Sequence, residues 1–232
     1  MKGDDPMYRQ FMNQLDSFYF DKDGKTVVSG EKSIKAMTLE KKMNDAGIVY
    51  NNDGWDSLVT ATKTGLVATV PFGAWWAGTL QDQCKDSSGK WAIIPLPAFD
   101  SATNSAAALG GSSLMVPSTT SNKDLAVAFS KFAMTDKASI MAGFTQFGLY
   151  PSYTPTYTDP IFAKGVDFFG GQKIWQVFDK IAKTMPTMNY TENYAEAHTY
   201  MVNAQAKILL NKGDVTTTMN NLQKQMVGSF GQ

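Results

Sequence analysis

Strand-like runs alternate with segments of helical periodicity along this chain, and no other feature constrains its fold as strongly. The predicted strands are 66–72, 91–99 and 109–117, with a hairpin at 18–28 that turns at Asp23-Gly24. The predicted helices are 7–18, 31–47, 54–64, 123–135, 136–147, 160–183, 191–211 and 214–226, with one more beginning near Ala74. This order predicts an α/β protein closed by a helical tail.

The charge of the chain is balanced, with 21 Lys and Arg residues against 21 Asp and Glu residues. A balanced chain offers no electrostatic case for binding nucleic acid or an anionic membrane surface. We therefore predict no nucleic-acid partner. The length of 232 residues suits one large domain or two small ones.

Cysteine and histidine are almost absent. Cys84 is the sole cysteine and His198 the sole histidine, which excludes an internal disulfide and most zinc or Ser-His-Asp chemistry. The pair Gly110-Gly111 leads into a strand-like run rather than a helix, which is not the pattern of a phosphate-binding loop. We predict no metal site and no cofactor, and we interpret His198 as a helix-face residue.

The stretch "VPFGAWWAGTL" at 70–80 carries the strongest indication of a binding site. Its strand-like run ends at Gly73, where a missing side chain lets a ligand approach the backbone. Trp75 and Trp76 follow and point in different directions, so one core cannot easily bury both. Flat aromatic rings stack on the apolar faces of sugars, while polar neighbours bind the hydroxyls.

Four short motifs follow one another in a recognisable order. They are GAW at 73–75, LP at 96–97, NKDLA at 122–126 and MP at 185–186. This ordered set resembles the extracellular solute-binding proteins of sugar ABC transporters, the group that includes maltose-binding protein. The resemblance runs across nearly the whole chain.

The resemblance implies a type II periplasmic-binding-protein-like fold with two α/β lobes that close over a ligand by a hinge motion. In that family the pattern occupies the later portion of a longer chain, so we expect a fragment without the leader and most of the N-terminal lobe. Residues 1–106 and 152–232 would form the C-terminal lobe. Residues 107–151 would be the return segment of the N-terminal lobe, and they would expose apolar side chains of 123–135, because the partners of those side chains lie in that lobe.

The function implied by the resemblance is non-catalytic capture of a sugar or oligosaccharide outside the cytoplasm, in the periplasm or on a lipid-anchored protein at the cell surface. The captured ligand would pass to the permease subunits of an ABC transporter. In that family the tryptophan of the GAW motif stacks on the sugar. The candidate ligand-binding residues are Trp75, Trp76, Gly73, Tyr8, Gly111, Ser112, Tyr190 and Tyr194.

Two other functions remain open from the residues alone. One is a carbohydrate-active hydrolase, which would use a pair of Asp or Glu residues across a sugar site. Glu192 and Glu196 share one helical face, although a solvated face explains such a pair more often. The other is a structural domain without a ligand. Shortening of an added oligosaccharide would distinguish the hydrolase from the binding protein.

Overall fold

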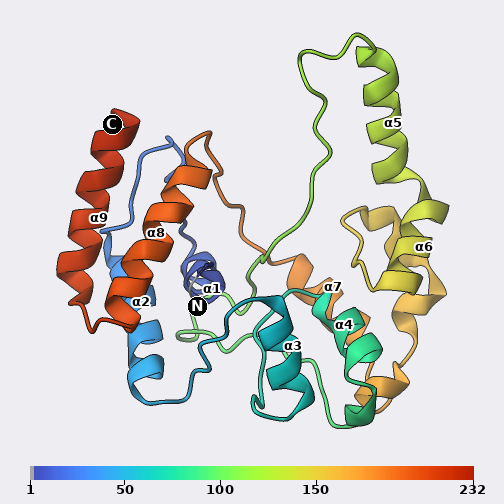
Figure 1. Ribbon diagram of the computed structural model, residues 1–232. Helices are drawn as coiled ribbons and strands as arrows, with labels where there is room; N and C mark the ends of the chain where they lie inside the picture. Colours follow the sequence, from blue (N-terminus) through green and yellow to red (C-terminus); the bar gives the residue numbers. More distant parts are fainter. Residues whose placement is uncertain (1–2) are drawn as a thin grey trace. The chain divides into compact units, whose positions relative to one another are not determined.

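The computed structural model describes residues 3–232, which separate into two compact units (Figure 1). Unit 1 contains residues 3–71, 95–109 and 181–232, and unit 2 contains residues 72–94 and 110–180. These boundaries follow the contacts within this chain. The predicted division at 106/107 and 151/152 assigns the chain to the lobes of a longer protein and stays a prediction.

Unit 1 is built from five helices. They are α1 (Pro6–Gln14), α2 (Glu31–Asp45), α3 (Trp55–Lys63), α8 (Tyr194–Leu209) and α9 (Val215–Phe230). Helices α1, α2, α8 and α9 pack around one apolar core (Figure 1). Several of its side chains are methionines. Met12, Met37, Met201, Met219 and Met226 are all fully buried there. Methionine is flexible enough to fill the irregular gaps between crossing helices.

The two helices of the tail confirm the predicted segments 191–211 and 214–226. Asp214 accepts a hydrogen bond from the backbone N–H of Thr217 at 2.8 Å and so caps the start of α9. Gly231 ends α9 in the left-handed conformation, at φ 67°. The predicted start of this helix therefore corresponds to a real cap, whereas the helix runs four residues beyond its predicted end at 226.

The hairpin predicted at 18–28 is present only as a turn with a single antiparallel bridge between Phe20 and Thr26. Asp21 accepts hydrogen bonds from the backbone N–H groups of Asp23 and Lys25, both at 2.9 Å. Gly24 adopts a φ of 78°, which favours glycine. The turn chemistry was correctly predicted, but its flanks do not form a strand ladder.

Unit 2 contains α4 (Trp76–Gln83), α5 (Lys123–Thr135), α6 (Lys137–Phe147) and most of α7 (Ile174–Ala182). Short 3₁₀ turns at Lys85–Ser87, Thr154–Thr158, Pro160–Ala163 and Asp167–Phe169 connect them. Its core is aromatic. The ring of Phe144 stacks on Phe162 at 4.9 Å between centroids and meets Trp175 edge-on at 4.6 Å.

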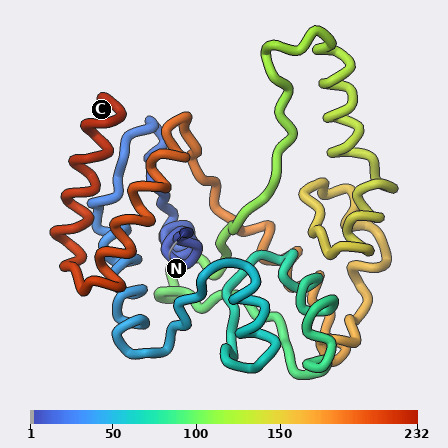
Figure 2. The backbone as a smooth tube through the Cα atoms, in the orientation of Figure 1, coloured from blue at the N-terminus to red at the C-terminus, as the bar shows by residue number. Residues whose placement is uncertain are grey.

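The strands predicted at 66–72, 91–99 and 109–117 do not form within the described residues, and this is the main correction to the sequence analysis. Figure 2 shows residues 110–122, which lead to α5, as an irregular segment without helix or strand. A strand is stable only when neighbouring strands pair with it. These runs have β-forming composition, but residues 3–232 provide them with no ladder partner.

The long helix predicted at 160–183 is also wrong over its first half. Only α7 is an α-helix in that range, and a 3₁₀ turn at Pro160–Ala163 and another at Asp167–Phe169 precede it. Gly170 and Gly171 adopt positive φ values of 63° and 80° between the second turn and α7. Glycines in this conformation interrupt a helix, whatever the apolar spacing around them.

Helix α5 exposes its apolar side chains, as the sequence analysis expected for this chain. Leu125 is 71% exposed, Phe129 63% and Phe132 58%. Contiguous exposed apolar surface of this kind usually marks a missing partner. In the described part of the chain, no helix has the combination of length and apolar composition needed to cross a membrane.

Candidate functional site

Trp75 precedes the first residue of α4 in unit 2 and is partly exposed. Its ring centroid lies 4.7 Å from that of Phe72 and 6.4 Å from that of Trp76, and both pairs are edge-to-face. Gly110 lies near the indole nitrogen, since a Cβ added to Gly110 would make ordinary contact with Nε1, at 3.7 Å. Trp75 is therefore an indole whose position is fixed by its neighbours and whose surface is only partly covered.

Trp76 has a different environment from its neighbour. It is 4% exposed, and its ring meets Phe72 edge-on at 5.5 Å. A tryptophan this buried is part of the core of unit 2. The structure therefore contradicts Trp76 as a ligand-binding candidate, because its ring is packed inside unit 2 and offers no face to a sugar.

The first N–H groups of α4 bond within the helix's own first turn and do not face a ligand. The N–H of Trp76 donates to the carbonyl of Gly73 at 2.9 Å, and that of Ala77 donates to Ala74 at 3.1 Å. These bonds between residues i and i−3 tighten the first turn and satisfy the donors internally. Gly73 thus acts as an acceptor within the turn, in addition to lacking a side chain.

Gly111 and Ser112 are exposed in the segment that follows Gly110. Gly111 has a φ of 110°, which only glycine adopts readily. Sequence reasoning selected these two residues and missed Gly110, which lies nearer to the Trp75 indole. The pair Gly110-Gly111 was the sequence signal that could have identified Gly110.

Tyr190 and Tyr194 lie together in unit 1. Their ring centroids are 4.6 Å apart, and Phe18 lies 5.0 Å from Tyr190 and 5.7 Å from Tyr194. Tyr190 is 49% exposed. The terminal nitrogen Nη1 of Arg9 donates to the Tyr194 hydroxyl at 3.4 Å. This cluster combines an exposed aromatic face with polar groups at its edge.

Tyr8 is in the core rather than on a surface. It is fully buried, and its hydroxyl makes a 2.8 Å hydrogen bond with the hydroxyl of Ser33. Burial raises the pKa of Tyr8 well above the ordinary value. An enclosed ring cannot stack on a ligand, so we do not retain Tyr8 as a contact residue.

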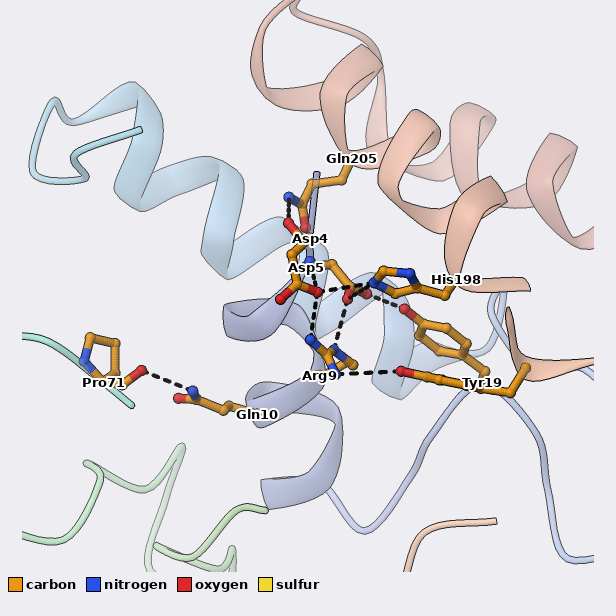
Figure 3. A network of polar contacts seen from close by, with 9 residues as sticks. Asp4, Asp5, Arg9, Gln10, Tyr19, Pro71, His198 and Gln205 are labelled. Atoms are coloured by element: carbon orange, nitrogen blue, oxygen red, sulfur yellow. Dashed lines mark hydrogen bonds and ion pairs between the residues drawn. The ribbon is translucent and has the colours of Figure 1, made fainter. Parts of the chain in front are cut away.

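An ion-pair network joins the start of α1 to α8 within unit 1 (Figure 3). The carboxylate of Asp5 is fully buried, and its Oδ1 lies 2.8 Å from Nε of Arg9 and 3.2 Å from Nε2 of His198. The hydroxyl of Tyr19 donates to the other oxygen of Asp5. Asp4 pairs with the same two cations, with its Oδ1 3.0 Å from Nε2 of His198. Two carboxylates are thus matched by two cations.

The carboxylates of this network stabilise the charged forms of His198 and Arg9. Hydrogen bonds to Asp4 and Asp5 raise the pKa of His198 to about 9. Burial alone would lower the pKa of Arg9, but the two carboxylates raise it above its ordinary value. His198 is therefore a charged partner at neutral pH. The helix-face interpretation missed this, because its carboxylate partners are distant in sequence.

The same side chains are the one candidate for a metal site among residues 3–232. Asp4, Asp5 and His198 offer ligand atoms that lie within 4.8 Å of one another. The guanidinium of Arg9, however, contacts both carboxylates from within the group. A cation already supplied by the protein fits an ion-pair network better than a metal centre.

We expect the His198 contribution to stability to disappear at alkaline pH. Because the pKa of His198 is raised from 6.5 to about 9, its stabilisation is complete below pH 6.5 and is lost as pH rises through 9. The loss should be about 1–2 kcal/mol, since hydrogen bonds to charged groups contribute about 1.5–3 kcal/mol and this side chain is partly solvated. Urea unfolding from pH 6 to pH 10 measures it.

A His198→Gln variant is the control for this titration. Burial raises the pKa of Glu40 to about 8, so Glu40 also lowers stability with rising pH in both proteins. The difference between the two proteins therefore isolates His198. Parallel stability curves for the wild type and the variant would contradict the expectation.

A solved structure with a similar fold is the GacH receptor of Streptomyces glaucescens, determined unliganded and in complex with acarbose. The TM-score is 0.71 at 18% identity, over 97% of this chain and 57% of that chain. This likeness confirms the type II periplasmic-binding-protein-like fold, although the described residues are mostly helical.

Two curated proteins are related in sequence. The lactose-binding protein of Rhizobium radiobacter is 29% identical over 191 residues, which cover 81% of this chain and 45% of that protein. The arabinooligosaccharide-binding protein of Bacillus subtilis (strain 168) is 31% identical over 135 residues, 56% of this chain and 31% of that protein. The chain therefore spans less than half the length of these relatives.

The family model described as bacterial extracellular solute-binding protein matches residues 2–140, which is more than half of the chain. The ordered motifs of the sequence, the fold and the curated relatives agree with this match. The chain belongs to the bacterial extracellular solute-binding protein family.

Proposed function

We propose that this chain is part of a sugar-binding subunit of an ABC importer, which holds an oligosaccharide without breaking any bond. The observation that carries the proposal is Trp75, a partly exposed indole packed edge-on against Phe72 and Trp76, with Gly110 nearby. Rigid indoles are suited to stacking on sugar rings. The family consists of binding proteins, and the relatives named above bind lactose and arabino-oligosaccharides.

We assign different roles to the retained site residues. In unit 2, Trp75 would stack on a sugar ring, and the exposed Gly111 and Ser112 would offer backbone and hydroxyl groups to its hydroxyls. In unit 1, Tyr190 would provide a second aromatic face. Tyr194, fixed by Arg9, would offer its phenol. We propose these two sets separately, each from the geometry of its own unit.

The proposed setting of this activity is extracytoplasmic, which is supported by the extracellular character of the family. Delivery of the ligand to permease subunits and attachment to the membrane by a lipid anchor are proposals that follow from the ABC-importer assignment. The division into a C-terminal lobe (1–106 and 152–232) and a return segment (107–151) belongs to the same proposal.

The test is a panel of oligosaccharides titrated calorimetrically into the protein produced from its complete gene. Lactose, an arabino-oligosaccharide and a malto-oligosaccharide represent the classes bound by known family members. We expect saturable binding of at least one of them, with the sugar recovered intact by chromatography. Shortened products would favour the hydrolase, and absence of heat with every sugar would contradict the proposal.

A further inference from the structure

Two glycines in unit 2 bring α4 and the end of α6 into backbone contact. A Cβ added to Gly78 would lie 2.8 Å from Cα of Gly148 and 2.9 Å from the carbonyl oxygen of Phe147. A Cβ added to Gly148 would lie 2.6 Å from Cα of Gly78. Carbon atoms in favourable contact are separated by about 3.5–4.0 Å. Neither position has room for a side chain unless the two backbones separate by about 1 Å.

The contact between Gly78 and Gly148 lies one helical turn from Trp75, the proposed sugar-stacking residue. The N–H of Gly78 donates to the carbonyl oxygen of Trp75 at 3.2 Å, so the two residues belong to one hydrogen-bonded turn. A helix moves as a rigid element, and any shift of α4 at Gly78 is passed to Trp75. The indole of Trp75 would then move relative to Gly110, which lies near Nε1.

The two glycines are required for different reasons. Gly148 follows the last residue of α6 with φ 69°, a left-handed conformation that favours glycine even without a close neighbour. Gly78 lies inside α4, where alanine is ordinarily the better helix former. Only the approach of Gly148 explains the need for glycine at position 78. A substitution of Gly78 therefore tests the backbone contact without also straining the backbone conformation.

We propose that Gly78 and Gly148 are positioning residues, whose backbone contact sets the place of the Trp75 indole and through it the affinity for sugar. The second half of this statement rests on the proposed function of Trp75. The first half concerns only the geometry of unit 2, and a measurement without sugar can test it.

The experiment compares Gly78→Ala with Gly143→Ala. Gly143 lies in α6, and a Cβ there would make only ordinary contact with Leu149, at 3.7 Å. The indole N–H resonance of Trp75, assigned by its loss in Trp75→Phe, is recorded by NMR in the absence of sugar. We expect it to shift in Gly78→Ala and to stay in place in Gly143→Ala. Sugar affinity should fall about three- to tenfold in the first variant and remain unchanged in the second.

An unshifted Trp75 resonance in folded Gly78→Ala would overturn the proposal. If that variant fails to fold, Gly148→Asn provides the same test, because asparagine tolerates the left-handed conformation and still adds a Cβ. Unfolding of both variants would also overturn it, since the contact would then serve stability alone. If the resonance shifts but Trp75→Ala and Gly78→Ala both leave sugar affinity unchanged, the positioning is supported and the sugar-stacking role of Trp75 fails.

Discussion

Replacing Arg9 by methionine is expected to lower the free energy of unfolding by about 3–5 kcal/mol, the range found when one partner of a buried ion pair is removed. The side chain of Arg9 is 13% exposed and that of its partner Asp5 is 0% exposed. Methionine keeps much of the volume of arginine and removes the charge. The carboxylate of Asp5 would then keep only His198 as a cation. Urea unfolding at pH 7 measures the loss.

The chain provides a matched control in Lys41→Met. Lys41 pairs with Asp45 across the same spacing of four residues, but that pair lies on the surface, with Asp45 52% exposed. Exposed pairs contribute about 0.2–1 kcal/mol, so we expect a much smaller loss. The double variant Asp5→Asn with Arg9→Met should recover part of the stability, because it leaves no unpaired charge buried. Equal losses for Arg9→Met and Lys41→Met would contradict the prediction.

The helices were largely predictable because their signals are local. Helix α5 occupies 123–135 as predicted, and α3 and α9 begin within one residue of the expected positions. Apolar spacing, Asp214 as a cap and glycine as a stop all act over a few residues. Sequence reasoning therefore works well wherever the stabilising contacts are close in sequence.

The strands were not predictable in the same way. The runs at 66–72 and 91–99 have strand composition, and the second contains prolines that suit an irregular end. Whether such runs form a sheet depends on pairing partners elsewhere in the chain. Residues 3–232 form only isolated β-bridges. Composition indicates that a segment can form a strand, but a sheet forms only when a second strand is present to pair with it.

The candidate site shows the same distinction between local and distant information. Trp75 could be selected from the GAW motif, but nothing local shows that Tyr8 is buried, or that of two adjacent tryptophans Trp76 is the buried one. The ion-pair network joins Asp5 and Arg9 to His198 across the length of the chain. The spacing of Asp5 and Arg9 at i and i+4 was the one sequence signal available for it.

Replacing Trp75 by alanine is expected to weaken sugar binding at least about tenfold, a loss of about 1.4 kcal/mol, while the protein stays folded. Aromatic stacking contributes about 0.5–1.5 kcal/mol beyond the apolar area that it buries. The ring is already fixed by Phe72 and Trp76, at 4.7 Å and 6.4 Å between centroids, so little side-chain entropy remains to be lost on binding. Calorimetric titration of the full-length protein with its sugar measures the effect.

Trp76→Ala is the matched control, because it removes the same side chain from the next position. Trp76 is 4% exposed, and truncation of a buried tryptophan costs about 3–5 kcal/mol of stability. We therefore expect the two variants to separate: Trp75→Ala loses affinity and keeps most of its stability, whereas Trp76→Ala loses stability. Two results would contradict the proposal: Trp75→Ala binds sugar as tightly as the wild type, or it unfolds as readily as Trp76→Ala. In either case Trp75 would be a packing residue and not the side chain that stacks on the sugar.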